Sequence, residues 1–371
     1  MHPLRKLGFL WSYSLLAVIV GAWVFGGPGW AWAGVTFTFV LIPVLDWAVG
    51  QDHRNLDREQ YNAALSDRYF DRLVYSHVYL HYGLLLWGSY VLTTEPLTAG
   101  QRLGLMVSIG LVAGTIINVA HELGHRSSRV AQLHAKLALV SVSYGHFLIE
   151  HNRGHHVHVA TPLDPATARK NQSVYAFWIR SIIGGYRSAW RLEANRLAKA
   201  GQPVWSRHNA MIGFTWLPIL LNVVLTMGFS WWAGRFAWIV PVFFVGQSLL
   251  GILLLETINY VEHYGIVRRE LAPGRYERVN PLHSWNASER ISNFVLFQLQ
   301  RHSDHHAYAS RPYQVLRHFG ESPQLPGGYP TMILLALVPP LWFAVMNPRL
   351  ERWRARAHTS EAMAVVVKQF A

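Results

Sequence analysis

Long runs of apolar residues alternate with polar, arginine-rich segments along this chain. A helix needs about 20 mostly apolar residues to cross the hydrocarbon core of a bilayer. Six runs have about that length, and we expect each of them to form a transmembrane helix. They cover residues 7–25, 30–50, 73–93, 103–120, 211–229 and 236–259.

Two shorter apolar stretches, residues 137–149 and 332–346, are expected to lie at the membrane interface or to be half inserted, and the second contains Pro339 and Pro340. The run at 7–25 has a basic start, but no small-residue cleavage site clearly follows it, so we expect a retained helix and not a secretion signal. No internal repeat interrupts the pattern. Residues 1–371 are therefore predicted to form a single all-α integral-membrane domain.

The distribution of arginine predicts how these helices are oriented. The loops after the first, third and fifth runs contain only Arg102 and Arg235 as basic residues. Because positive charge favours the cytoplasmic side, we expect both termini and the segments 121–210 and 260–371 in the cytoplasm, where the segments form a helical cap. Arginines are frequent after the second, fourth and sixth runs, and include Arg54, Arg58, Arg68, Arg72, Arg126, Arg129, Arg153, Arg268 and Arg269.

Composition narrows the class of protein further. Hydrophobic residues make up 51% of the chain, charged residues only 14%, and there are 16 tryptophans, which favours a membrane protein. The absence of cysteine excludes disulfides, thiolate metal sites and iron–sulfur clusters made from this chain. The formal net charge of +13 is explained equally well by lipid-facing arginines and by a surface for an acidic partner.

Histidines are concentrated in three short motifs. Of the 20 in the chain, HELGH, EHNRGHH and QRHSDHH contain two or three each, and one more follows the sixth run. Residues three or four apart share a helix face, and all three motifs fall on the expected cytoplasmic side. We therefore expect their side chains to converge on a metal site. The candidate ligands are His121, His125, His151, His155, His156, His263, His302, His305 and His306.

Nine imidazoles exceed what one first-row ion can bind, so two metal ions are expected. Imidazole suits iron, zinc, copper and nickel alike. Zinc sites are commonly four-coordinate and would leave some of these histidines without a role, whereas two irons with four or five imidazoles each use all of them. The remaining histidines are expected to be packed within a helix or to have structural or supporting roles: His77, His81, His134, His146, His158, His208, His283 and His318.

Two other classes of protein compete with this interpretation. HELGH alone is typical of a zinc metalloprotease, with His121 and His125 as ligands and Glu122 as the base, but a protease leaves the other two motifs unexplained. A metal transporter would place ionisable residues along the middle of its helices, where only His77 and His81 lie. Metal analysis would separate these classes.

The residues around the histidines are more specific. The segments NVAHELGHR, YGHFLIEHNRGHHVHVATPLDPATAR, NYVEHYGIVR and LQRHSDHHAYASRPYQVLR resemble the bacterial alkane 1-monooxygenases, within the membrane di-iron superfamily of fatty-acid desaturases and hydroxylases. The resemblance runs from LIPVLD at residues 41–46 to GGYP at residues 327–330. The xylene-type methyl monooxygenases share the histidine spacing, but the QRHSDHHA context is more similar to the alkane enzymes.

This resemblance implies six transmembrane helices, a cytoplasmic cap with two non-haem irons bound by the nine histidines, and O₂ as co-substrate. The implied reaction is terminal hydroxylation of medium-chain linear alkanes to primary alcohols; aromatic methyl groups and fatty acyl chains are alternative substrates. Electrons would come from a separate rubredoxin with an NADH-dependent rubredoxin reductase upstream. The expected location is the bacterial inner membrane, with the lipid bilayer and a hydrophobic small molecule as further partners, and no nucleic acid.

Carboxylates near the histidine motifs are expected to support the metals by accepting the second ring N–H of a ligand. The alternative is an ordinary salt bridge to Arg126, Arg153, Arg169 or Arg301. The candidates are Glu122, Glu150, Asp164, Glu262 and Asp304. The substrate is expected to arrive from the bilayer through a narrow apolar channel, and Gly110, Gly114 and Gly251 would either leave space for that channel or allow close helix packing.

Overall fold

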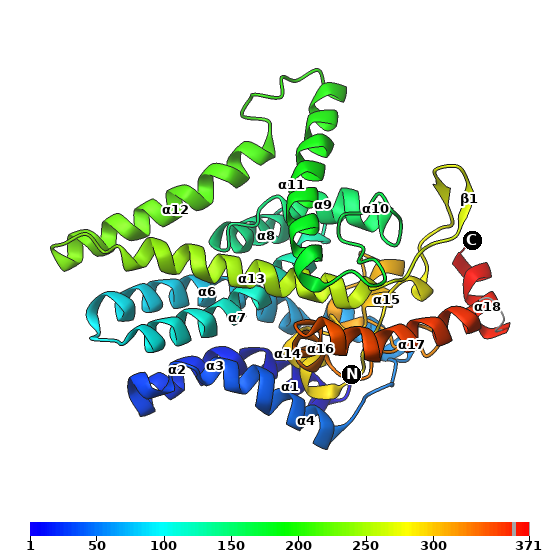
Figure 1. Cartoon of the computed structure of the whole chain (residues 1–371), viewed down its shortest axis with the longest axis horizontal. Coiled ribbons are helices and arrows are strands. Elements are labelled where there is room, and N and C mark those ends of the chain that lie inside the picture. Colours follow the sequence, from blue (N-terminus) through cyan, green and yellow to red (C-terminus); the bar gives the residue numbers. More distant parts are fainter. Residues whose placement is uncertain (358–360, 371) are drawn as a thin grey trace.

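The computed structural model describes residues 1–357 and 361–370 and is almost entirely helical (Figure 1). Within these residues the only sheet is a hairpin of β1 Glu270–Ala272 and β2 Arg275–Tyr276. The predicted all-α class is therefore confirmed. The first half of the chain forms α1 Pro3–Gly8, η1 Phe9–Tyr13, α2 Ser14–Gly26, η2 Gly27–Trp30, α3 Ala33–Thr36, η3 Phe37–Leu41, α4 Ile42–Val49, α5 Arg58–Ser66, α6 Arg68–Thr94, α7 Ala99–Gly124, α8 Arg129–Ser141, α9 Phe147–Glu150, η4 His151–His155, α10 His156–His158 and α11 Val174–Lys199.

The second half contains two further long helices and many short ones. Several of the short helices surround the ends of the long ones, at the side where both chain termini lie in Figure 1. These elements are α12 Ala210–Ala233, α13 Ile239–His263, η5 Pro281–His283, α14 Arg290–Val295, α15 His302–Ala307, η6 Tyr313–Val315, α16 Tyr329–Ala336, α17 Pro339–Ala357 and α18 Glu361–Phe370.

Four of the six predicted spans correspond to helices that are long and apolar enough to cross a membrane: Pro3–Trp30, α7, α12 and α13. The predicted span at 30–50 forms the shorter apolar segment Ala33–Val49, which a π turn at η3 interrupts. The run at 73–93 lies within α6, which has 27 residues but carries many polar side chains. The prediction of six spans is thus confirmed only in part, and the chain is a multi-pass membrane protein.

The apolar stretch 332–346 is divided between α16 and α17. Together these two helices are long and apolar enough to cross a membrane, but the chain bends by 119° between them. Counted as one broken or re-entrant span, the pair brings the number of candidate spans in the described residues to five. The bend lies just before Pro339 and Pro340, the first two residues of α17, since proline cannot continue the hydrogen bonding of a preceding helix.

Helices α7 and α13 pack against each other at the centre of the bundle, with α6 and α12 beside them (Figure 1). A Cβ atom at Gly110 would lie 2.7 Å from Leu250 Cβ, and one at Gly251 would lie 2.8 Å from Ala113 Cβ. These glycines therefore allow close helix packing, which was one of the two roles expected for them. The close packing holds the carboxyl ends of α7 and α13 side by side, where three of the candidate histidines lie.

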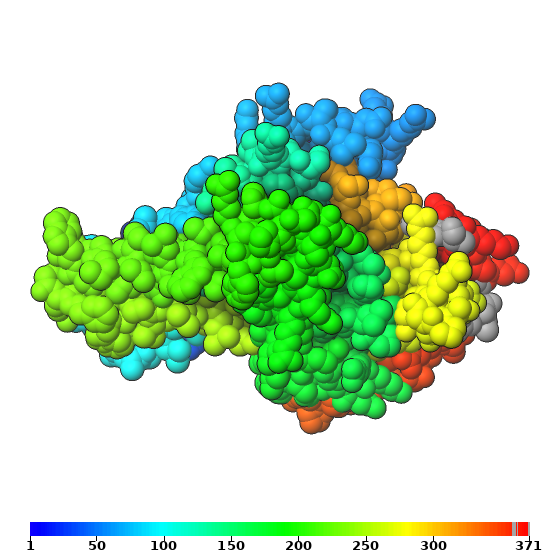
Figure 2. All heavy atoms as spheres, turned by 90° about the horizontal axis from the view of Figure 1, so that it is seen from above, coloured from blue at the N-terminus to red at the C-terminus, as the bar shows by residue number. Residues whose placement is uncertain are grey.

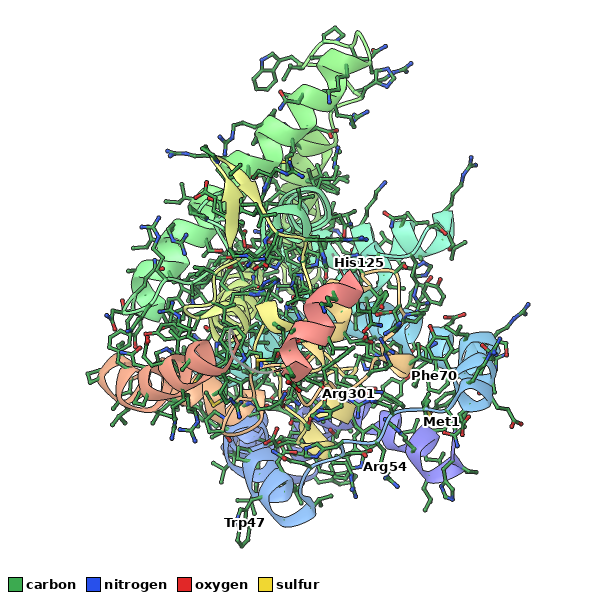
Figure 3. The ribbon with its side chains drawn as sticks, turned by 90° about the vertical axis from the view of Figure 1, so that its right-hand side faces the viewer. Met1, Trp47, Arg54, Phe70, His125 and Arg301 are labelled. Atoms are coloured by element: carbon green, nitrogen blue, oxygen red, sulfur yellow. The ribbon has the colours of Figure 1, made fainter. Side chains whose placement is uncertain are left out.

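Helix α11 crosses the direction of the long helices, and α12 extends beyond the rest of the molecule (Figures 1 and 2). Seen from the end that carries α15 and α18, His125 and Arg301 lie near the middle of the molecule (Figure 3). The histidine motifs are therefore enclosed by the short helices at one end of the bundle.

Asp46 joins the N-terminal helices to this end of the bundle. Its buried Oδ1 accepts hydrogen bonds from the backbone N–H groups of Ile291 and Ser292, both at 3.0 Å, and thereby caps α14. Gly328 passes so close that a Cβ atom would lie 2.8 Å from Asp46 Oδ2. Asp46 thus joins α4 to α14 by hydrogen bonds, and the start of α16 packs closely against the same carboxylate.

Replacing Asp46 with alanine should destabilise the protein by about 1–3 kcal/mol, because two buried N–H groups lose their acceptor. The measurement is thermal or denaturant unfolding in detergent. Asp46→Asn is the matched control, since its amide oxygen can still accept both bonds. Equal stability of the alanine variant and the wild type would contradict this role.

Candidate metal centre

The structure brings all nine candidate histidines together in two adjacent groups. His121, His125, His151, His156 and His305 form the first group, and His155, His263, His302 and His306 form the second. Within each group, one nitrogen from every ring lies within 4.8 Å of all the others. The ring centroids of His156 and His306, one from each group, are only 4.6 Å apart. The nine histidines come from α7 and its C-cap, the α9–η4–α10 segment, α13 and α15.

In the first group the Nε2 atoms face one another. His121 Nε2 lies 2.8 Å from His305 Nε2, and His125 Nε2 lies 3.1 Å from His151 Nε2. His156 Nε2 is 2.9 Å from His151 Nε2 and 3.2 Å from His305 Nε2. A single imidazole nitrogen has either one proton or one lone pair, so it cannot satisfy two such neighbours by hydrogen bonding alone.

The second group has the same arrangement. His302 Nε2 lies 3.2 Å from His263 Nε2 and 2.9 Å from His306 Nε2. His155 Nε2 is buried and has no hydrogen-bond partner among the described residues. Two nitrogens that bind one ion at a right angle, each about 2.1 Å from it, would lie about 3.0 Å apart. The convergent nitrogens and the unpaired His155 Nε2 therefore fit two metal ions, one in each group.

A π turn distributes the EHNRGHH histidines between the two groups. In a regular α-helix His151 and His155 would share a face, as residues four apart do. The turn at η4, His151–His155, adds a residue to the helix, so that His156 faces the same way as His151. His151 and His156 consequently belong to the first group, and His155 belongs to the second.

Burial keeps most of these imidazoles neutral. Outside the long helices, burial is the largest cause that lowers the pKa of every ring in the two groups except His155, and the neighbouring imidazoles lower the pKa further. The pKa of His155 is raised instead, because the Asp164 carboxylate outweighs the effect of burial. The pKa of His125 falls to about 4. Neutral rings keep the lone pair that a metal ion requires. The pKa values of His151, His156, His302, His305 and His306 lie well below the ordinary value.

Asp164 orients His155. His155 Nδ1 lies 2.9 Å from Asp164 Oδ2, which also accepts a hydrogen bond from Thr167 Oγ1, and the Ala166 N–H donates to Oδ1. Burial alone would raise the pKa of Asp164, but His155 and these hydrogen bonds hold it below the ordinary value. With a proton on Nδ1, His155 directs the lone pair of Nε2 toward the second group.

Glu262 contacts the second group from α13. Its Oε2 lies 3.1 Å from His302 Nε2, and its Oε1 accepts a hydrogen bond from Tyr329 Oη at 2.6 Å. The sequence analysis did not predict Tyr329 as a site residue. It lies in the GGYP segment, which was noted only as part of the family resemblance. Glu262 is thus the carboxylate placed beside the ring nitrogens that converge in this group.

The other three candidate carboxylates make no hydrogen bond to a histidine among the described residues. Glu122 binds Arg126, with Oε1 2.9 Å from Nη2, which is the salt bridge considered as the alternative. Asp304 binds Arg311 and Arg317 instead of Arg301. The arginines lie in the segments that follow α7 and α15, and a charged guanidinium binds a carboxylate more strongly than a neutral imidazole does.

Histidines outside the two groups have protein partners in most cases. His77 contacts the Leu73 and Ser12 carbonyl oxygens, and His134 contacts Tyr79. His283 contacts Glu277, and His318 contacts Ser288. The expectation that these residues are structural therefore agrees with their contacts.

Comparison with known proteins gives the same family as the motifs. The fatty acid desaturase family matches residues 101–336. The chain is 44% identical to alkane 1-monooxygenase 1 of Pseudomonas aeruginosa, over 96% of this chain and 93% of that protein. It is 42% identical to alkane 1-monooxygenase 2 of Alcanivorax borkumensis, over 95% of this chain and 93% of that protein. The chain belongs to the alkane 1-monooxygenase family.

Sequence identity also distinguishes this chain from the related xylene-type enzymes. The hydroxylase component of xylene/toluene monooxygenase from Pseudomonas putida is 29% identical over 94% of this chain and 90% of that protein. The alkane 1-monooxygenases are more similar, as the QRHSDHHA context indicated. Membership in this family also argues against the zinc metalloprotease interpretation of HELGH.

Proposed function

We propose that this protein hydroxylates the terminal methyl group of medium-chain linear alkanes to primary alcohols, with O₂ as co-substrate and two non-haem irons bound by the nine histidines. The observation that carries this proposal is the pair of adjacent groups made of five and four histidines. Two irons would activate O₂ for attack on a methyl group that offers neither an acidic proton nor a polar handle. The chain itself would hold the irons, orient the ring of His155 through Asp164, and exclude bulk water by burial.

A narrow apolar cavity of about 60 Å³ is the proposed route for the alkane. Along α7 it extends from Asn118 to Leu111, which are three and ten residues before His121, so it reaches roughly 15 Å from the histidines at 1.5 Å per residue. Phe39 and Ile333 line it from other helices, and so does Gly114, one of the three glycines considered for the channel. An apolar lining suits a hydrocarbon that partitions into lipid.

Replacing Leu111 with tryptophan should shorten this cavity at the end far from the histidines. Long alkanes should then lose turnover by roughly 10–200-fold relative to short ones, the range typical of a changed apolar pocket. The measurement is the product yield for each chain length. Leu103→Trp, on an exposed position of the same helix, is the control. An unchanged chain-length profile in Leu111→Trp would exclude this cavity as the substrate route.

The electron donor is proposed to be a rubredoxin, itself reduced by an NADH-dependent reductase. The chain has no cysteine from which to build an iron–sulfur centre of its own, so the donor must be a separate protein or domain. The net charge of +13 would favour an acidic donor. We expect the apparent KM for rubredoxin to rise with ionic strength, because salt screens exposed charges. A KM that does not depend on salt would remove the electrostatic argument but not the reaction.

The membrane orientation is likewise a proposal. Arginine-rich segments follow α7 and α13, so the positive-inside rule favours the histidine groups and both termini on the cytoplasmic side of a bacterial inner membrane. That orientation would give a soluble cytoplasmic donor access to the metals. Labelling of an introduced cysteine near His158 in intact cells would test it.

Product analysis tests the proposed reaction. The purified protein would be combined with rubredoxin, its reductase, NADH and a panel of alkanes from hexane to hexadecane. Primary alcohol is the expected product. Oxidation of xylene or a fatty acid in preference to every alkane would favour the alternative substrates, and alkene formation would displace hydroxylation as the reaction.

A further inference from the structure

A small polar chamber lies directly beside the histidine groups. Its volume is about 10 Å³, close to the space that one water molecule requires. Polar side chains of His146, Glu150, Ser181, Glu256 and Asn259 line it together with two of the candidate ligands. A polar chamber of this size is suited to an ordered water, whereas the alkane cavity is apolar.

The chamber contains both a hydrogen-bonded network and an unused acceptor. Tyr144 Oη donates to Glu256 Oε1 at 2.6 Å, and Ser181 Oγ donates to Glu256 Oε2. Glu150 Oε1 is buried without a hydrogen-bond partner among the described residues. Buried carboxylate oxygens are rarely left unpaired, so a water in the chamber would satisfy Glu150 and connect it to the Glu256 network.

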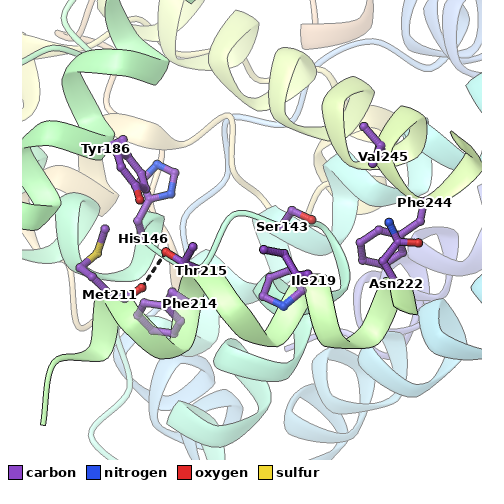
Figure 4. Close-up of a pocket in the computed structure, with 11 residues that line it drawn as sticks. Ser143, His146, Tyr186, Met211, Phe214, Thr215, Ile219, Asn222, Phe244 and Val245 are labelled. Carbon is purple, nitrogen blue, oxygen red and sulfur yellow. Dashed lines mark hydrogen bonds between the residues drawn. The ribbon is translucent and has the colours of Figure 1, made fainter. Parts of the chain in front are cut away.

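His146 links this chamber to a larger pocket on its other side. That pocket has a volume of about 270 Å³ and lies between α11, α12 and α13. His146 lines both cavities. Its ring contacts Tyr144 on the chamber side, with centroids 4.6 Å apart, and Tyr186 on the pocket side, at 5.2 Å. Figure 4 shows His146 and Tyr186 next to each other at one end of the larger pocket, with Asn222 toward the other end.

The proposed reaction needs protons at a buried site. Its balance is R–CH₃ + O₂ + 2 e⁻ + 2 H⁺ → R–CH₂OH + H₂O: one C–H bond is replaced by a C–O bond, one oxygen atom enters the alcohol, and the other leaves as water. The external donor supplies the electrons. The protons cannot cross the apolar alkane cavity, because a charge has no hydrogen-bonding partners there. A separate polar path is required.

We propose that His146, the water in the polar chamber and the Tyr144–Glu256 pair form the path that carries protons from the larger pocket to the metal centre. This inference rests on the proposed hydroxylase function and deepens it. His146 is the gate of the path, since its ring alone among the polar side chains lines both cavities. Glu256 and Tyr144 hold the water next to His151 and His155.

The first test replaces His146 with alanine in the full-length, iron-loaded protein. We expect kcat to fall by about 10²-fold, the size typical of losing a proton-transfer group, while iron content and the KM for alkane stay unchanged. Imidazole in solution should restore part of kcat, because the larger pocket admits it, and the solvent deuterium isotope effect on kcat should increase. Glu256→Gln should also lower kcat, without restoration by imidazole.

His134→Ala is the matched control, since His134 is as buried as His146 but lines neither cavity. It should keep wild-type kcat and isotope effect. An unchanged kcat in His146→Ala would overturn the proposal, and so would a loss that imidazole does not restore or that follows from lost iron. Absence of alcohol from the wild-type protein would instead count against the hydroxylase function itself.

The second test does not depend on turnover. Hydroxyl-radical footprinting labels side chains that contact ordered water, even when they are buried. We expect Tyr144 to be labelled at least several-fold faster than Tyr313, a similarly buried tyrosine outside the chamber. Ala166→Leu, which fills the chamber, should abolish this difference. Equal and slow labelling of both tyrosines in the wild type would show that the chamber is dry and would overturn the proposed path.

Discussion

Replacing His302 with alanine should lower the iron content from two to about one per chain and abolish alkane oxidation. His302 lies at the centre of the second group, where its Nε2 is within 3.2 Å of the nitrogens of His263 and His306 and 3.1 Å from Glu262 Oε2. Its loss would leave three histidines in the group and remove the ring that contacts Glu262 Oε2. The decrease in turnover should exceed the roughly 10–100-fold typical of changing a residue that only supports a ligand.

Iron analysis of the purified protein and alcohol yield per chain are the two measurements. His318→Ala is the control, because His318 contacts Ser288 and lies outside both groups. That variant should retain two irons and wild-type turnover. A His302→Ala protein that still held two irons and hydroxylated alkanes would show that the second group is not a metal site.

Replacing Asp164 with alanine should weaken iron binding to the second group by roughly 10–100-fold, with a similar loss of activity at limiting iron. The Asp164 carboxylate fixes the proton of His155 on Nδ1, at 2.9 Å, and thereby frees Nε2 for the metal. Without it the ring can adopt the other tautomer or rotate. Titration of the metal-free protein with ferrous iron would measure the change.

Asp164→Asn is a second variant that tests the same contact. Its amide oxygen can accept from His155 Nδ1, but it lacks the negative charge, so an intermediate affinity is expected. If both variants bound iron as tightly as the wild type, the contact between Asp164 and His155 would have no role in metal binding. If both unfolded at lower temperature with unchanged affinity, the carboxylate would act only on stability.

The residues of the candidate site could be predicted from sequence, but their division between two metals could not. Spacing alone placed His151 and His155 on one helix face, whereas the π turn at η4 moves His156 beside His151 and sends His155 to the other group. A π turn depends on how a helix packs against its neighbours, and no residue pattern in EHNRGHH specifies it.

The supporting carboxylates show the same limit. All five lie inside or beside the histidine motifs, but among the described residues only Asp164 and Glu262 form a hydrogen bond or close ionic contact with a histidine. Glu122 and Asp304 bind arginines, and the partners of Asp304 lie 7 and 13 residues away along the chain. Contacts of this kind require the folded arrangement of α15 and the segment that follows it.

The membrane helices were predicted well where apolar residues were continuous. Helices α7, α12 and α13 match their runs because burial and lipid exposure both favour apolar residues there. The run at 73–93 became part of the more polar α6, whose His77 is hydrogen-bonded to the carbonyl oxygens of Leu73 and Ser12. Such internal contacts make polar residues tolerable in a helix, and hydropathy alone does not reveal them.

The most direct test of the central claim is an anomalous-scattering map of the purified protein, measured on both sides of the iron absorption edge. We expect two iron peaks, one within bonding distance of the five histidines of the first group and one within bonding distance of the four of the second. A single metal bound only by His121 and His125, or zinc in place of both irons in active protein, would contradict the account.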